Sequence, residues 1–226
     1  MTAPSRQSPD GHLPAWLRDL AAAAAAMDVP RALRPPAHGG RRSAVLVLFG
    51  EGADGPDLLF IQRGEGLRRH PGQPAFPGGA IDDGDDGPVA AALREAVEET
   101  GLDPAGVEVL GTLPELFIVR SRFRVVPVLA WWRRPSAVRP MDIGEVAAVE
   151  RIPVAALADP AHRVMLRHPS GRTGPAFRVG TMLIWGFTAA LVDRLLALGG
   201  WERPWDATAV RELPDASVVH DPERFL

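Results

Sequence analysis

The chain has no cysteine, no lysine and no tyrosine. Without cysteine it forms no disulfide, has no thiol nucleophile and cannot bind zinc through thiolates. Without lysine it forms no Schiff base and lacks the phosphate-binding lysine of a P-loop. The chain also lacks a large excess of either charge, because it has 25 basic and 28 acidic residues and a net charge of −3. We therefore expect a cytoplasmic protein with no drive toward nucleic acid or membranes.

The composition is that of an ordinary globular protein, with 226 residues, 46% hydrophobic and 23% charged. The alanine-rich run 20–27 is too short to cross a bilayer, and a surface helix over about 14–33 is the prediction. We expect residues 1–40 to form an N-terminal helix and linker and 41–201 to form the main domain. Residues 202–226 are rich in Pro, Asp and Arg, which favours a loosely held tail.

Strand-like and helix-like patterns alternate along the chain, which predicts the α/β class. The segment 64–87 is rich in Gly, Pro and Asp and is expected to be a long functional loop. Trp131 and Trp132 should point to opposite faces of a strand, one into the core and the other as a candidate for the substrate cleft. The expected strands are 44–49, 58–61, 107–113, 117–132 and 145–152, and the expected helices are 88–100 and 180–198.

Segment 88–100 is predicted to be an amphipathic helix with a cluster of carboxylates. Pro88 suits its first turn and Gly101 its end. At 100° per residue, an apolar face lies opposite a charged face. The apolar face is formed by Val89, Leu93, Ala96, Val97 and Thr100, and the charged face by Arg94, Glu95, Glu98 and Glu99.

The charged face holds more negative charge than its one arginine can neutralise. Glu95 lies one turn from Glu98 and Glu99, and like charges ~5–6 Å apart repel. A solvated face with an ordinary Arg94–Glu98 ion pair is one interpretation. The other is a cation site, because clustered carboxylate oxygens suit Mg²⁺ or Mn²⁺. The glycine-rich segment 78–85 leads into this helix, so metal-assisted attack on a phosphate is the leading chemistry.

At these residues the sequence resembles the Nudix family. Gly79, Asp85 and the run 94–102 are similar to the Nudix box, G-x5-E-x7-R-E-U-x-E-E-x-G-U, in which U is apolar. Asp85 stands where Glu is usual, and eight residues rather than seven separate it from Arg94. These two departures resemble one branch of the family, the coenzyme A pyrophosphatase-like proteins.

A second pattern upstream also resembles that branch. Residues 59–79 are similar to its signature, roughly L-L-T-x-R-S-x3-R-x3-G-x3-F-P-G-G, with Arg63 and Arg68 in register. Ile61 and Gly64 depart from it, where the signature has Thr and Ser. Guanidinium groups bind phosphates through paired hydrogen bonds, so both arginines are expected to bind substrate. Ion pairs with nearby carboxylates are the alternative.

The resemblance also implies roles for the charged residues of the box. Glu95, Glu98 and Glu99 would hold Mg²⁺ or Mn²⁺, and Arg94 would orient them through charged hydrogen bonds. The general base would be Glu98 or Glu145, a loop carboxylate farther along the chain.

Three residues of the long loop complete the expected substrate site. Gly78 and Gly79 let the backbone approach the ligand, and the Gly78 carbonyl is a further candidate for the metal. His70 either hydrogen-bonds a phosphate or holds the loop.

The fold implied by the resemblance is the Nudix α/β/α sandwich, a mixed β-sheet between helices. The activity implied is metal-dependent hydrolysis of coenzyme A or its derivatives to 3′,5′-ADP and an (acyl-)phosphopantetheine. A pyrophosphatase for another nucleoside diphosphate derivative, such as ADP-ribose or a dinucleotide, is the alternative of the same class. A Nudix-fold module that senses a nucleotide without cleaving it is the alternative of a different class. The expected partner is a small nucleotide substrate, and a homodimer is left open.

Overall fold

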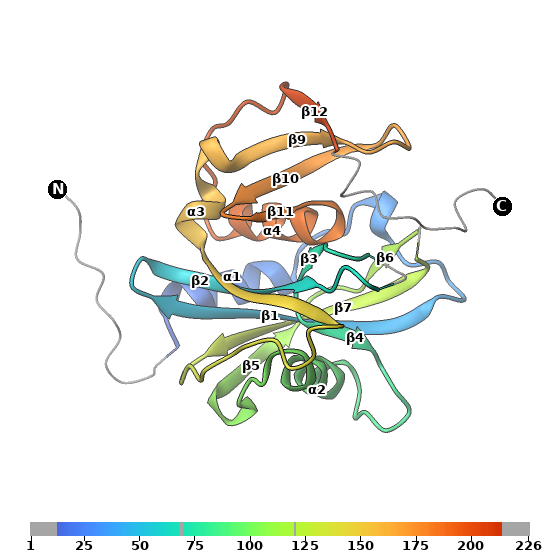
Figure 1. The fold of residues 1–226 in the computed structure, drawn as a ribbon, viewed down its shortest axis with the longest axis vertical. Helices are drawn as coiled ribbons and strands as arrows, with labels where there is room; N and C mark the ends of the chain where they lie inside the picture. The colour runs from blue at the N-terminus through green and yellow to red at the C-terminus, as the bar shows by residue number, and fades with distance from the viewer. Residues whose placement is uncertain (1–12, 68–69, 120, 214–226) are drawn as a thin grey trace.

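The computed structural model describes residues 13–67, 70–119 and 121–213, and the statements below concern these ranges. Its centre is a mixed eight-stranded sheet (Figure 1). The strands are β1 (Arg41–Gly52), β2 (Gly55–Arg63), β3 (Pro74–Ala75), β4 (Gly78–Ala80), β5 (Val107–Thr112), β6 (Leu116–Ile118), β7 (Phe123–Trp132) and β8 (Val146–Pro153). The main path runs β3-β2-β1-β7-β5, with β4 on β1, β6 on β7 and β8 on β2. Only the long β1–β7 pair of this sheet is parallel.

The first two predicted strands form the expected hairpin. Phe49 pairs with Leu58, and Gly52 pairs with Gly55 across a tight turn. Gly55 has φ +94°, a backbone conformation that residues other than glycine rarely adopt. The hairpin also carries β8, which pairs antiparallel with β2 and shifts register at Gln62 and Arg63. This places the end of β2, which carries Arg63, beside the start of β8, which follows Glu145 directly.

Helices cover both faces of the sheet, which confirms the predicted α/β/α sandwich. Strand β1 alternates between the two sides, with Leu46 facing one core cluster and Val47 the other. Helix α2 (Pro88–Thr100) packs on the Leu46 side, and α1 (Ala15–Ala25) and α4 (Gly186–Leu198) on the Val47 side (Figure 1). The remaining helical segments are α3 (Val154–Ala158), η1 (Arg31–Leu33), η2 (Pro104–Gly106) and η3 (Pro160–His162).

A second sheet, which the sequence did not reveal, lies beyond α4 (Figure 1). Its strands are β9 (Arg163–Arg167), β10 (Thr173–Val179), β11 (Met182–Ile184) and β12 (Val210–Glu212), in the order β11-β10-β9-β12. The helix predicted over 180–198 is therefore too long, because its first part is β11 and Gly186 begins the helix. Phe177, Met182 and Ile184 join the α1–α4 core, so the second sheet extends that core.

The expectation of a loosely held tail is wrong for residues 202–213. Strand β12 pairs in parallel with β9, and Leu213 donates its N–H to the Arg167 carbonyl at 2.9 Å. The Trp205 ring lies 4.4 Å from the guanidinium carbon of Arg163, whose side chain is 1% exposed. Arg163 also pairs with Asp193 of α4. A buried cation thus holds this segment, which the polar composition did not indicate.

The N-terminal helix is part of the core, and it is shorter than predicted. Leu17 and Leu20 are buried, and Trp16 packs edge-on against Phe49 at 5.6 Å and Trp201 at 5.3 Å. The helix ends near Ala25, and η1 follows as a separate turn. Within the described ranges, no helix is both long and apolar enough to cross a membrane.

The paired tryptophans of β7 point to opposite faces, as their spacing predicted. Trp131 joins the core on the α1 side and Trp132 the core on the α2 side, where the Arg151 guanidinium covers its ring at 5.0 Å. Both residues are almost fully buried, with 3% and 1% of their surface exposed. The suggestion that one of them lines the substrate cleft is therefore wrong.

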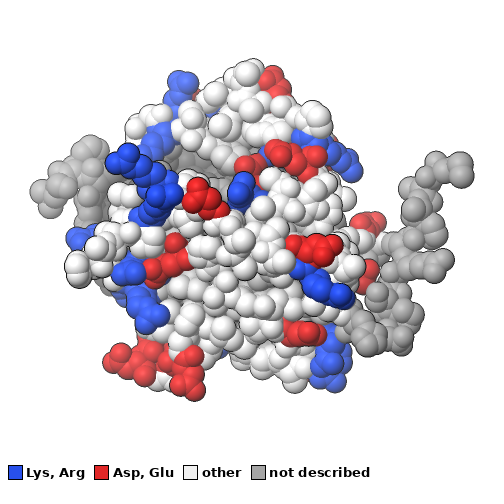
Figure 2. Space-filling model, turned by 180° about the vertical axis from the view of Figure 1, so that it is seen from behind, with Lys and Arg blue, Asp and Glu red and all other residues white. Residues whose placement is uncertain are grey.

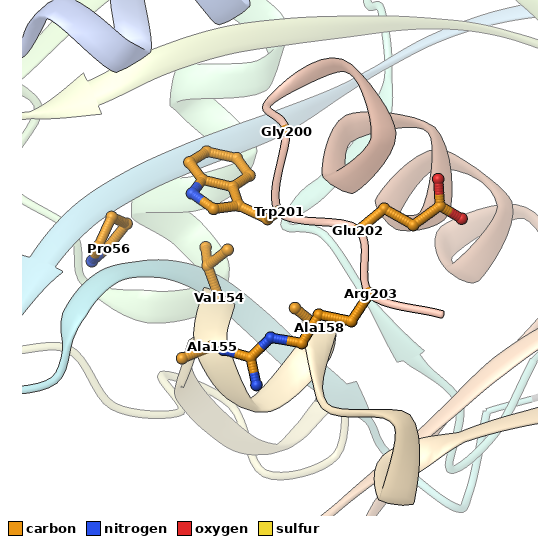
Figure 3. A pocket seen from close by; sticks show the side chains of 8 residues that line it. All are labelled: Pro56, Val154, Ala155, Ala158, Gly200, Trp201, Glu202 and Arg203. Atoms are coloured by element: carbon orange, nitrogen blue, oxygen red, sulfur yellow. The ribbon is translucent and has the colours of Figure 1, made fainter. Parts of the chain in front are cut away.

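The surface offers local charges rather than one broad field. Figure 2 shows acidic and basic side chains interspersed over the face it draws. A pocket of about 280 Å³ opens between the β1–β2 turn, α3 and the segment after α4 (Figure 3). Pro56, Val154 and Trp201 are among its lining residues, and none of the predicted site residues lines it. The predicted carboxylates lie on α2, away from the residues that line this pocket.

Candidate active site

Helix α2 forms as predicted, but the face it buries differs from the predicted one. Pro88 occupies its first turn, and Gly101 ends it in the left-handed conformation with its N–H donated to the Val97 carbonyl. The buried residues are Ala91, Ala92, Ala96, Glu99 and Thr100. Val97, assigned to the apolar face, is instead 37% exposed. Ala92 and Ala96 lie on the buried face, and Glu99 shares that face because it follows Ala96 by three residues.

Glu99 is the most constrained carboxylate of the helix. It is 8% exposed, and its Oε2 accepts the Gly78 N–H at 2.9 Å. Burial raises the pKa of Glu99 to about 7, against the effects of the Gly78 N–H and the Arg63 charge, and the carboxylates of Glu95 and Glu145 raise it further. These interactions bring together residues from α2, β2, β4 and the loop before β8. Four of the predicted site residues therefore surround Glu99.

The glycine pair of β4 makes room for these carboxylates. Gly78 and Gly79 pair with Val45 and Ala44 of β1. A Cβ at Gly79 would stand 2.3 Å from Oε1 of Glu95, and one at Gly78 would stand 2.3 Å from the Ala44 carbonyl. Any larger residue would displace either the strand or the carboxylate. The pair thus acts by close approach, which is the physical reason for glycine here.

Arg94 is held on both sides by carboxylates. Its Nε and Nη2 donate to the two oxygens of Asp85 at 3.0 Å each, and Nη2 also donates to the Ala80 carbonyl at 3.1 Å. Its Nη1 donates to Glu95 at 3.0 Å and Glu98 at 3.1 Å. The Asp85 side chain is 7% exposed, and its hydrogen bond with Arg94 lowers the pKa of Asp85. Asp85 therefore positions Arg94, which in turn positions two glutamates.

Arg63 ends β2 at the edge of this cluster. Its Nε is buried and makes no hydrogen bond to the described residues. The Arg63 charge acts on Glu99, so the guanidinium lies near the carboxylates. A guanidinium beside carboxylates offers positive charge to a phosphate bound at the same place. Arg68 lies outside the described residues.

His70 lies in a tight turn of the long loop. Its φ is +52°, and its Nδ1 is 2.9 Å from Oε1 of Gln73. Of the two roles considered for His70, this contact supports holding the loop.

Glu145 reaches the cluster through a capped turn. Asp142 accepts the Gly144 N–H on its side chain at 2.7 Å and the Glu145 N–H on its carbonyl at 3.0 Å. The Glu145 carbonyl in turn accepts the N–H of Gly64 at 2.8 Å. Asp142 was not among the predicted site residues, although an Asp two residues before a Gly is a recognisable turn signal.

The carboxylates fit a hard divalent cation, but they do not form a closed cage. Within the described ranges, no group of three or more His, Cys, Asp or Glu side chains is already arranged around a metal position. The reason is Arg94, which holds oxygens of Glu95 and Glu98. Burial raises the pKa of Glu95 as well as that of Glu99, so a cation bound beside them would favour the ionised form of both carboxylates. The Glu98 side chain is 58% exposed and has room to rotate toward a cation.

Comparison with known proteins identifies the family of this chain. The profile of the NUDIX domain matches residues 40–169. The uncharacterized Nudix hydrolase NudL of Cronobacter sakazakii is 40% identical over 177 residues, which cover 73% of this chain and 85% of that protein. NudL of Escherichia coli K12 is 40% identical over 147 residues, covering 62% of this chain and 73% of that protein.

A solved structure shares the fold. The Nudix hydrolase RenU of M. smegmatis superposes with a TM-score of 0.52 at 21% identity, covering 75% of this chain and 91% of that one. The NUDIX profile, the NudL relatives and the Nudix-box residues on α2 all indicate the same family. The chain belongs to the Nudix family of hydrolases, enzymes that act on phosphoric anhydrides.

Proposed function

We propose that this Nudix hydrolase cleaves the diphosphate of coenzyme A or its acyl and oxidised derivatives, releasing 3′,5′-ADP and a phosphopantetheine. The observation that carries the proposal is the Arg63 side chain, whose charge acts on Glu99 and whose buried Nε has no hydrogen-bond partner among the described residues. Arg63 also belongs to the upstream pattern that resembles the coenzyme A branch. A diphosphate is bound by positive charge. The Arg63 guanidinium would supply one such charge, and a cation held by the neighbouring carboxylates would supply another.

Glu95, Glu98 and Glu99 are the residues that would hold Mg²⁺ or Mn²⁺. Such an ion, when bound, polarises phosphoryl oxygens and acidifies a bound water. Glu99 is fixed by the Gly78 N–H, and Glu95 and Glu98 are oriented by Arg94. Arg94 is fully engaged with Asp85, Ala80 and these glutamates, so its role is positioning and not substrate contact.

Two carboxylates remain candidates for the general base. Glu98 is exposed on the helix, while Glu145 lies in the loop before β8 and its charge acts on Glu99. A base that is not needed to hold the metal can accept the proton of the attacking water without weakening metal binding. On that ground we assign the base to Glu145. Glu145→Gln should then lower kcat and leave the affinity for Mn²⁺ unchanged, whereas Glu98→Gln should lower both.

The substrate class is tested with a panel of diphosphates. Coenzyme A, ADP-ribose and a deoxynucleoside triphosphate are each incubated with Mg²⁺ and with Mn²⁺, and the products are separated by mass. We expect coenzyme A to have the highest kcat/KM and to give 3′,5′-ADP. A preference for ADP-ribose of about tenfold, the size of a single lost substrate contact, would contradict the proposal. Binding without turnover of any diphosphate would instead identify a sensor.

A further inference from the structure

An exposed isoleucine stands at the rim of the candidate site. Ile143 is 78% exposed, the highest fraction among the large apolar side chains of the described residues. It lies two residues before Glu145, in the loop that closes the cluster around Glu99. A single exposed apolar residue needs no explanation in general, but its position here is fixed by the residues around it.

The backbone of Ile143 is packed against the end of β2. A Cβ placed on Gly64 would stand 2.3 Å from the Gly144 carbonyl oxygen and 3.3 Å from that of Ile143. Gly64 follows Arg63 directly, so the backbone of Ile143 lies close to the end of the strand that carries Arg63. Asp142 caps the turn on the other side through the Gly144 N–H. The loop is therefore tied down at both ends while the side chain stays in solvent.

We infer that Ile143 is a specificity-determining residue that packs against an apolar group bonded close to the diphosphate of the substrate. This inference rests on the proposed function. In coenzyme A, the pantoyl carbon that carries two methyl groups is separated from the diphosphate by a single methylene. In ADP-ribose, both sides of the diphosphate lead to hydroxylated sugars. A branched aliphatic side chain on the loop that packs against the end of β2 therefore favours the first substrate over the second.

The test compares Ile143→Ser with the wild-type enzyme on coenzyme A and on ADP-ribose, in the presence of Mg²⁺. We expect Ile143→Ser to raise KM for coenzyme A about tenfold with kcat unchanged, and to leave KM for ADP-ribose unchanged. Ile143→Val should keep most of the wild-type preference. The matched control is Val210→Ser, which changes an exposed apolar residue of β12 in the second sheet and should alter neither substrate.

The results distinguish a failure of the inference about Ile143 from a failure of the proposed function. If wild-type enzyme cleaves coenzyme A and Ile143→Ser leaves its KM unchanged, the inference is overturned and the proposed function stands. Equal losses on both substrates would also overturn it, because they indicate a general disturbance of the loop around Glu145. If the wild-type enzyme prefers ADP-ribose, both the inference and the proposed function are overturned.

Discussion

Adding one methyl group at Gly79 should disable the site without unfolding the protein. A Cβ there would stand 2.3 Å from Oε1 and 2.4 Å from Cδ of Glu95, where an ordinary contact begins near 3.4 Å. The carboxylate must therefore retreat by about 1 Å or rotate away, and Arg94 limits how it can do so. Because the obstacle is the end of a side chain and not backbone, the fold can absorb the change.

The expected cost is in turnover. A displacement of about 1 Å in a positioned catalytic group lowers kcat on the order of 100-fold. Gly79→Ala is assayed for Mg²⁺-dependent diphosphate hydrolysis and for thermal unfolding. Gly84→Ala is the matched control, since a Cβ at Gly84, in the same loop region, meets nothing within 4 Å. Wild-type kcat in Gly79→Ala would refute the assignment of Glu95 to the site, and a collapsed Tm would refute the claim that the fold absorbs the change.

Three further predictions follow from single contacts. Asp85→Asn should lower kcat about tenfold by releasing Arg94, while Asp83→Asn, on an exposed carboxylate of the same loop, should not. In metal-free protein the pKa of Glu99 is raised from 4.5 to about 7, so its contribution to stability is fully present below 4.5 and is lost as the pH rises through 7. Urea unfolding is therefore measured for wild type and Glu99→Gln from acidic to mildly alkaline pH. Over this range the free energy of unfolding of the wild type should fall by about 3 kcal/mol relative to that of the variant. An equal pH dependence of the free energy of unfolding in the two proteins would contradict this. Trp205→Ala should lower the free energy of unfolding by about 2 kcal/mol without changing kcat, and an unchanged Tm would show that Arg163 does not hold the tail.

The sequence was sufficient to predict the elements with strong local signals. The helix over 88–100 has proline at its start, glycine at its end and a clear charged face, and it forms with those bounds. The hairpin of β1 and β2 has two apolar runs around a glycine-rich turn. In both cases the local preference and the tertiary structure agree, which is why a pattern alone identified them.

The second sheet could not be predicted in the same way. Strand β10 contains Gly174 and Pro175, which usually mark a turn, and β12 is exposed along its whole length. Strand β11 is three residues long and runs almost directly into α4, so its apolar residues extended the helical pattern. These strands depend on pairing with distant residues, and such pairing leaves little trace in the local sequence.

The burial of Glu99 could not be predicted from the sequence either. Helical periodicity separates one face from another, but the alanines of α2 fit either a buried or an exposed position. A glutamate is normally assigned to solvent, and only the Gly78 N–H and the close β4 strand explain why this one is inside. The same burial raises its pKa, so a cation bound beside this carboxylate would favour its ionised form.

The central claim is that the carboxylates around Glu99 form a divalent-metal centre. Direct measurement of Mn²⁺ binding by electron paramagnetic resonance, in the absence of substrate and at mildly alkaline pH, tests it most closely. Wild-type protein should bind Mn²⁺, and Glu99→Gln should weaken binding on the order of 100-fold while its metal-free Tm at this pH is no lower than that of the wild type. Equal Mn²⁺ affinity in the wild type and in Glu99→Gln would contradict the assignment of the metal centre.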